Sequence, residues 1–217
     1  MPAADRELRI CEIFYSLQGE SGTAGFPTVF IRLTGCPLRC RYCDTSYAFS
    51  GGEHMSLSGI LQQVKSYSTR YVTVTGGEPL AQRDCWLLLK MLCDAGYTTS
   101  LETSGAIDIS QVDKRVSTIM DIKTPGSGES DRNRFQNIEL LKSSDQVKFV
   151  ITDRVDYDWS RQFIEENELT GKCEILFSPV HGELDPVDMA EWILNDNLLV
   201  RMQIQLHKYL WGDERGR

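Results

Sequence analysis

Three cysteines stand close together in the segment GCPLRCRYCDT, residues 35–45. Cys36, Cys40 and Cys43 have the spacing Cys-x3-Cys-x2-Cys, which can bring three sulfur atoms around one centre. A structural zinc site usually takes four ligands, and the histidines of this chain form no zinc-like pair. Iron–sulfur clusters are held by cysteine thiolates. A cubane cluster held by only three thiolates leaves one iron atom free for an exogenous ligand.

A second group of interest is the segment VTVTGGEP at residues 72–79. Gly76 and Gly77 follow a run typical of a strand, and Pro79 suits the first turn of a helix. Two glycines let the backbone approach a ligand closely, and Glu78 adds a carboxylate beside them. Taken alone, such a turn is as often purely structural as ligand-binding.

Two further positions carry reactive or charged groups at expected strand ends. Arg32 ends the run PTVFIRL and could hold a carboxylate through a bidentate fork, the alternative being a surface arginine. Asp44 and Thr45 follow the last cysteine, and their types alone favour a helix cap.

The elements that must position these residues are short apolar runs alternating with helical patterns. Strands are expected at 27–33, 70–75, 98–103, 117–123, 146–151, 173–179 and 201–207. Helices are expected at 56–69, 79–97, 156–168 and 186–195. This alternation predicts an α/β fold with right-handed crossovers. Because a complete eight-fold barrel usually needs about 250 residues, we expect a partial TIM-like barrel of about six parallel strands with fewer, modified helices.

Such folds bind ligands at the carboxyl ends of their strands, which is where the cysteines and glycines fall. The 217 residues show no linker, and we expect a single domain over 1–217. The net charge of −8 argues against a broad nucleic-acid surface. The chain carries an odd number of cysteines and no apolar run resembling a signal peptide or membrane span, so we expect a cytoplasmic protein with no membrane contact.

The segment CPLRCRYC resembles the signature of radical S-adenosylmethionine (SAM) enzymes. The resemblance implies that Cys36, Cys40 and Cys43 hold a 4Fe–4S cluster whose fourth iron is chelated by SAM. It implies further SAM-binding residues: Tyr42 near the adenine, Gly76, Gly77 and Glu78 at the methionine amino group, and also Asp44, Asp121, Ile122, Lys123 and Ser178. Many relatives carry Ser-Pro-Lys at 121–123 and Gln-Pro at 178–179, so this chain departs from them there.

The segments EIFYSLQGE, FIR, LETSG and QLHKYL resemble the 7-carboxy-7-deazaguanine synthase family, and together they span nearly the whole chain. That family converts 6-carboxy-5,6,7,8-tetrahydropterin to 7-carboxy-7-deazaguanine with loss of ammonia, on the route to queuosine and related 7-deazapurines. The resemblance implies that Thr45 binds Mg²⁺ bridging to substrate. It implies a substrate pocket in which Arg32 binds the carboxylate, Glu20 the guanidine-like portion, and the others the pterin edge and walls: Leu17, Gln18, Gly19, Thr75 and His207.

The resemblance also implies a flavodoxin or ferredoxin as electron donor, and with base rates it favours a homodimer. Two alternatives remain open from the residues alone. One is a different radical SAM enzyme, such as a glycyl-radical activating enzyme. The other is a non-enzymatic zinc or iron–sulfur binding module. The final WGDERGR also departs from relatives that end sooner.

Overall fold

The computed structural model describes residues 5–217 and contains one mixed sheet, in the strand order β3-β1-β2-β4-β5-β6-β7-β8-β9. The strands are β1 (Glu7–Leu17), β2 (Pro27–Leu33), β3 (Glu53–Ser56), β4 (Tyr71–Gly76), β5 (Thr98–Thr103), β6 (Ser117–Asp121), β7 (Gln146–Ile151), β8 (Glu174–Pro179) and β9 (Arg201–Met202). The α-helices are α1 (Leu57–Val64), α2 (Cys85–Asp94), α3 (Arg154–Glu166), α4 (Pro186–Asn195) and α5 (Leu206–Trp211). Short 3-10 helices cover Ser46–Phe49, Pro79–Ala81, Pro125–Ser127, Ser130–Arg132 and Phe135–Leu140.

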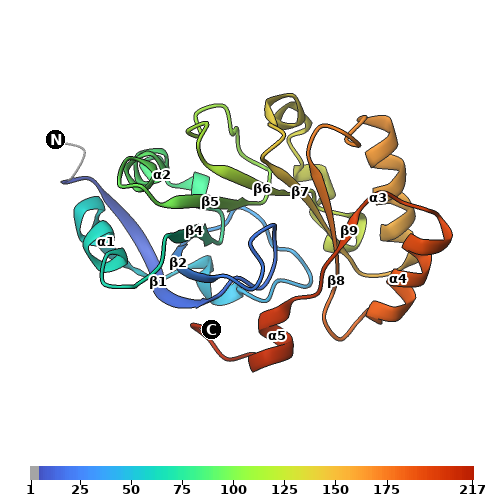
Figure 1. Cartoon of the computed structure of the whole chain (residues 1–217), viewed down its shortest axis with the longest axis horizontal. Helices are drawn as coiled ribbons and strands as arrows, with labels where there is room; N and C mark the ends of the chain where they lie inside the picture. Colours follow the sequence, from blue (N-terminus) through green and yellow to red (C-terminus); the bar gives the residue numbers. More distant parts are fainter. Residues whose placement is uncertain (1–4) are drawn as a thin grey trace.

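The sheet is parallel from β2 to β9, whereas β1 is antiparallel to both β2 and β3. Its two edge strands are β3 and β9, so the sheet stays open within the described residues. The expected partial barrel of parallel strands is therefore confirmed. Figure 1 shows the strands crossing the molecule, with α1 and α2 at one end and α3 and α4 at the other.

The two faces of the sheet differ in chemistry because successive side chains along a strand point to opposite sides. One face is apolar and belongs to the core, with Val74, Leu101 and Phe149 fully buried. The other face lines a cavity and carries polar side chains. Arg32 pairs with Thr75 across β2 and β4, and Asp121 pairs with Lys148 across β6 and β7. We call this second face the concave face.

The helices begin at side-chain caps. Ser56 accepts a hydrogen bond from the backbone N–H of Gly59, and Asp153 accepts one from that of Asp156. Asp185 caps α4, with Pro186 in the first turn. These caps satisfy N–H groups that have no partner inside the helix.

The helix expected over 79–97 is interrupted, and the expectation was wrong in that respect. A 3-10 turn covers Pro79–Ala81 and α2 begins only at Cys85. Gln82 between them has extended backbone, and its side chain bonds the backbone of Arg9 and of Thr34. These tertiary hydrogen bonds hold residue 82 outside the helix.

Two further expectations need correction at the ends of the chain. The expected strand 201–207 is short: only Arg201–Met202 pairs with β8, and α5 begins at Leu206. The strand β1 was not predicted at all. Its pairing with β2 has a register shift between Ile10 and Glu12, which breaks the alternation of buried and exposed residues.

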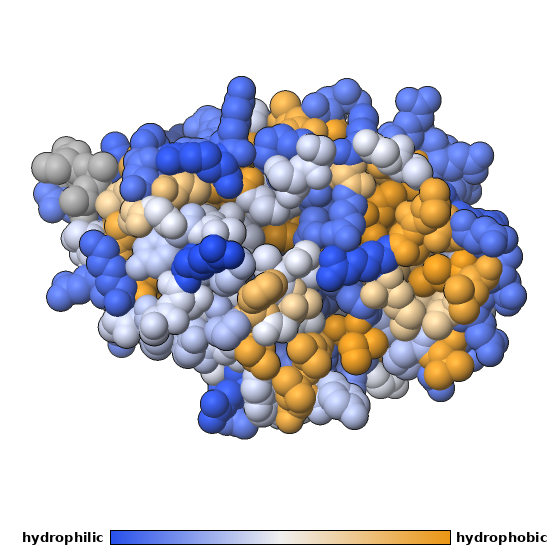
Figure 2. Space-filling view, in the orientation of Figure 1, coloured by the Kyte–Doolittle hydropathy of each residue, from blue (hydrophilic) through white to orange (hydrophobic). Residues whose placement is uncertain are grey.

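Exposed apolar side chains gather near the C-terminal elements. Leu194, Leu199, Ile204 and Leu210 are all exposed, and Figure 2 shows orange groups on this face around α4 and α5. We call these four residues the α4–α5 patch. Within residues 5–217, no helix has both the length and the apolar character needed to cross a bilayer.

Candidate active site

A cavity of about 470 Å³ opens on the concave face, and the cysteine loop forms part of its wall. This volume suits a small-molecule ligand. Most of the residues selected from the sequence line it: Leu17, Gln18, Gly19, Glu20, Arg32, Cys36, Cys40, Tyr42, Cys43, Asp44, Thr45, Thr75, Gly76, Gly77, Asp121, Lys123 and His207. They come from loops and strand ends far apart in the sequence, as expected for an α/β site.

Three selected residues lie outside the lining of this cavity. Glu78 is completely buried, and Ile122 belongs to the apolar core. Ser178 is also buried and donates a hydrogen bond to Glu20 at 3.0 Å. These three residues can therefore act on a ligand only through their backbone atoms or by positioning neighbouring residues.

The three cysteines occupy the loop between β2 and the 3-10 helix Ser46–Phe49. The loop is tied down by backbone hydrogen bonds, from Gly35 to Ala48 at 2.8 Å and from Arg41 to Ser127 at 2.9 Å. Burial raises the pKa of all three thiols, that of Cys40 to about 11. The side chains are free thiols facing one cavity, a donor set that suits iron–sulfur chemistry.

Among residues 5–217, no three His, Cys, Asp or Glu side chains converge closely enough to hold a single metal ion. A cubane cluster is larger than one ion and binds each thiolate through a different iron atom. All three cysteines line one cavity, where such a group would be placed.

The glycine turn after β4 packs directly against the cysteine loop. The N–H of Gly77 donates to the carbonyl of Leu33 at 3.1 Å, and that of Glu78 donates to the carbonyl of Gly35 at 2.7 Å. A Cβ atom on Gly77 would lie 2.9 Å from the Cβ of Cys36. Close approach of the two motifs therefore requires glycine at this position.

The carboxylate of Glu78 is used inside the protein. It accepts hydrogen bonds from the Thr103 hydroxyl at 2.9 Å, the backbone N–H of Ser104 at 2.7 Å and that of Leu80 at 2.9 Å. Thr103 and Ser104 themselves line the cavity. Glu78 thus positions the end of β5 at the cavity wall.

Buried charges of both signs line the cavity on β6 and β7. Lys123 lies 2.9 Å from Asp121, and Lys148 lies 3.8 Å from Asp121 and 3.4 Å from Glu20. Burial by itself would lower the pKa of each lysine, but the neighbouring carboxylates outweigh it and raise both pKa values. Both ammonium groups are therefore charged at neutral pH.

A network of polar side chains lies on β4 and β5. Glu102 accepts hydrogen bonds from Thr75 at 2.9 Å and from Gln18 at 3.3 Å, and Gln18 also reaches Thr73 at 3.2 Å. The side chain of Gln18 is almost fully buried. This network joins the loop after β1 to the concave face.

Arg32 lies against an aromatic wall. Its Nε donates to Glu12 at 2.8 Å, and its guanidinium lies 5.5 Å from the ring centre of Phe14 and 5.9 Å from that of Tyr47. The Tyr47 hydroxyl donates to the same Glu12 oxygen at 2.8 Å, and burial raises the pKa of Tyr47 to about 12. The terminal nitrogens of Arg32 have no hydrogen-bond partner among residues 5–217, which leaves them free for a ligand.

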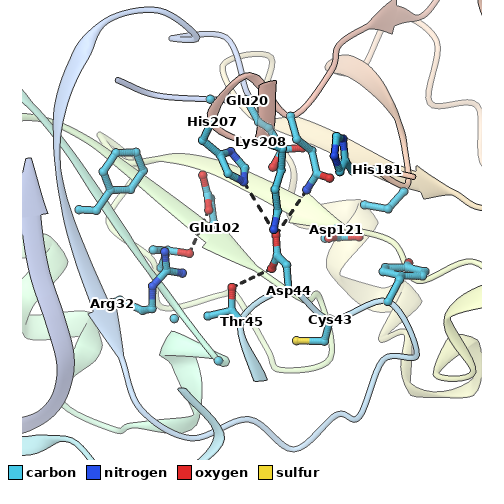
Figure 3. Close-up of a pocket in the computed structure, with 18 of the residues that line it drawn as sticks. Glu20, Arg32, Cys43, Asp44, Thr45, Glu102, Asp121, His181, His207 and Lys208 are labelled. Carbon is cyan, nitrogen blue, oxygen red and sulfur yellow. Dashed lines mark hydrogen bonds and ion pairs between the residues drawn. The ribbon is translucent and has the colours of Figure 1, made fainter. Parts of the chain in front are cut away.

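Asp44 has polar neighbours from two parts of the chain (Figure 3). Thr45 donates to it at 2.8 Å, and the Nε2 atom of His207 lies 3.9 Å away. Desolvation would raise the pKa of Asp44, but the contacts with His207 and Thr45 hold it below its ordinary value. The backbone of α5 approaches closely here because the residue facing His207 is Gly19.

Sequence reasoning missed several cavity residues: Phe14, Tyr47, Glu102, Lys148, Lys208 and the segment 212–217. A signal existed for two of them. Glu102 interrupts TTSLET and Lys148 interrupts QVKFVI, and a charged residue inside a buried strand suggests a partner or a function. The tail carried no such signal, because its position depends on where α5 docks.

Two buried polar atoms at the cavity have no protein partner among the described residues: the Tyr42 hydroxyl and the Asp121 Oδ1 atom. Buried polar groups are normally hydrogen-bonded, so these atoms fit a polar ligand between the cysteine loop and β6. Together with the three thiols and the close glycine turn, they fit a 4Fe–4S cluster with SAM beside it.

Comparison with known proteins is consistent with this geometry. A family model described as the radical SAM superfamily matches residues 30–122. The 7-carboxy-7-deazaguanine synthase of Chlorobaculum tepidum is 45% identical over 99% of both chains. The chain belongs to the 7-carboxy-7-deazaguanine synthase family. The enzyme of that name from Koribacter versatilis is 40% identical, over 95% of this chain and 98% of its own.

A solved structure has a similar fold. The crystal structure of QueE from Escherichia coli superimposes with a TM-score of 0.77 at 22% identity, covering 93% of this chain and 95% of the other. At that identity the likeness concerns the fold alone. It is consistent with the partial barrel described above.

Proposed function

We propose that this protein is a radical SAM carbon–nitrogen lyase that converts 6-carboxy-5,6,7,8-tetrahydropterin to 7-carboxy-7-deazaguanine and ammonia, in queuosine or related 7-deazapurine biosynthesis. The observation that carries the proposal is one cavity with two chemically different walls. The cysteine loop forms one wall, and the polar side chains of the concave face form the other. The close relatives of that name support the assignment.

In this proposal Cys36, Cys40 and Cys43 hold the cluster, and Asp121 and Lys123 lie on the SAM side with Tyr42. When bound, the cluster and SAM would supply the radical chemistry that abstracts hydrogen from C6 of the pterin. The protein positions the substrate and excludes water. Glu78 acts indirectly, by holding Thr103 and Ser104 at the cavity wall.

The substrate occupies the concave face in this account. The free terminal nitrogens of Arg32 suit a carboxylate, because a guanidinium fork binds it in bidentate fashion. Gln18, Glu102 and His207 line the same cavity and would bind the polar edge of the pterin. Glu20 already contacts Lys148 and Ser178, so these three residues would bind the pterin together.

We include Mg²⁺ at Thr45 in the proposal. Magnesium keeps several waters and takes few protein ligands, completing its shell with substrate oxygens. The Thr45 hydroxyl lies beside the ionised Asp44 at the cavity, so a divalent cation would find negative charge there.

The proposal also covers partners and setting. A flavodoxin or ferredoxin would supply the electron, and the α4–α5 patch supports a homodimer because exposed apolar patches often mark interfaces. We expect no nucleic-acid or membrane partner, one radical SAM domain over 1–217 and a cytoplasmic location, where free thiols stay reduced.

The test is turnover under anaerobic conditions. Reconstituted protein is incubated with the carboxypterin, SAM, Mg²⁺ and a strong reductant, and the deazaguanine product and ammonia are measured. We expect both products in equal amounts, with less product when Mg²⁺ is removed. A colourless zinc protein without turnover would favour the binding-module alternative. SAM cleavage without any reaction of the pterin would favour another radical enzyme.

A further inference from the structure

The C-terminal segment returns to the cavity after α5. Helix α5 ends at Trp211, Gly212 has a positive φ of 61°, and the chain then runs back toward the β1–β2 side of the sheet (Figure 1). Residues 212–217 all line the cavity, on the same side as Phe14 and Tyr47. The tail therefore forms part of the cavity mouth.

The charged residues of this tail differ in their pairing. Asp213 pairs with Lys208, and Arg217 pairs with Glu214 at 3.2 Å. Arg215 has no carboxylate partner and no hydrogen-bond partner among residues 5–217. Its guanidinium carbon lies 4.1 Å from the ring centre of Tyr47. The side chain is thus oriented by stacking, while its five N–H donors stay available.

The Tyr47 ring is shared by two arginines. Arg32 lies 5.9 Å from the same ring centre, so one aromatic ring contacts two arginines that both line the cavity. Glu12 lies 2.8 Å from Arg32 and offsets one positive charge, and the other has no acidic partner. Arg215 therefore brings a positive charge without an ion-pair partner among residues 5–217 to the cavity that Arg32 also lines.

A bound anion would give the positive charge of Arg215 a partner. A carboxylate on the terminal nitrogens of Arg32 would lie in the cavity that Arg215 also lines, and hydrogen bonds to charged groups contribute more than neutral ones. We propose that Arg215 is a second anion-binding residue of the substrate site and closes the tail over the carboxylate that Arg32 binds. This inference rests on the proposed function, which supplies the carboxylate.

The experiment measures binding to the protein without SAM, so that no turnover occurs. Anaerobic calorimetric titration is performed with the carboxypterin and with a tetrahydropterin lacking the 6-carboxylate. We expect Arg215→Gln to raise the dissociation constant of the carboxypterin about tenfold, from the loss of one charge-assisted contact. The analogue without a carboxylate should bind the variant and the wild type equally.

The matched control is Arg70→Gln, which removes another exposed arginine stacked on a tyrosine, 5.0 Å from the Tyr71 ring and away from the cavity lining. It should leave both dissociation constants unchanged, and a melting curve checks that each variant folds. If Arg215→Gln weakened the binding of both ligands equally, or of neither, the inference would be overturned. The proposed function would still stand in that case, provided that the wild-type protein converts the carboxypterin. Failure of wild-type protein to bind or convert the carboxypterin would instead overturn the proposed function, and the inference with it.

Discussion

At the residue scale, the cavity depends on charges that are paired with one another inside the protein. Asp121 is the central acid, because it lies within ion-pair distance of both Lys123 and Lys148. Its side chain is only 16% exposed, so water cannot replace the carboxylate if it is removed. Removing one partner from a buried ion pair costs far more than removing one from an exposed pair.

We predict that Asp121→Asn lowers the free energy of unfolding by about 3 kcal/mol, because two buried ammonium groups lose their shared counterion. Denaturant unfolding of the cluster-free protein measures this. Asp94→Asn is the control, since Asp94 also bridges two cations, Lys90 and Arg115, but is 47% exposed. The Asp94 variant should unfold at nearly the same denaturant concentration as the wild type, because water screens exposed ion pairs. Similar losses in the two variants would show that the buried charges do not support the fold.

At the element scale, the site is built where one loop and one turn meet. The cysteine loop after β2 and the glycine turn after β4 are joined by backbone hydrogen bonds, because their strands are parallel neighbours. Sequence reasoning anticipated both strands and both motifs. It could not anticipate that Gly77 faces Cys36, since that contact depends on the register of β2 with β4.

We predict that Gly77→Ala displaces the cysteine loop and reduces the iron bound per chain after reconstitution. The added methyl group has no space, and overpacking of this kind costs about 1–3 kcal/mol. Iron analysis and denaturant unfolding provide the measurements. Gly59→Ala in α1 is the control, where the nearest atom to the new Cβ would be the Ser56 hydroxyl at 3.1 Å. Full iron loading of Gly77→Ala would contradict the close packing of the two motifs.

The parallel strands were predictable because their apolar runs are buried on the helical side. The polar side chains within those runs, such as Thr73, Glu102 and Lys148, identify the concave face once the strand period of two is applied. By contrast, β1 escaped prediction because its register shift interrupts that period. Tertiary hydrogen bonds of Gln82 likewise broke a helix that local sequence favours.

At the scale of the whole molecule, residues from the first strand to the last helix meet at one cavity. Leu17 and His207 lie near opposite ends of the chain, yet both line it, and the backbone of Leu206 bonds Gly19 at 3.2 Å. The lining of the cavity includes residues of β1, β2, β4, β5, β6 and β7. Anything that binds only the folded state stabilises that state by mass action.

We predict that saturating SAM raises the melting temperature of the reconstituted protein. At one hundred times its dissociation constant a ligand contributes about 2.7 kcal/mol, which corresponds to roughly 5–10 °C in a chain of this size. Anaerobic thermal scans measure the shift. Cys40→Ala should show no shift, whereas Cys93→Ala, in α2 and outside the cavity lining, should behave like the wild type. An equal shift in Cys40→Ala would place SAM binding away from the cluster.

The central claim is that the protein directs radical chemistry to C6 of the carboxypterin. The most direct measurement is anaerobic turnover of substrate carrying deuterium at C6, followed by mass analysis of SAM, product and ammonia. We predict deuterium in the 5′ position of recovered SAM, together with the ring-contracted product and one ammonia for each product formed. Recovery of the pterin unchanged, or product formation with no deuterium in SAM or 5′-deoxyadenosine, would contradict it.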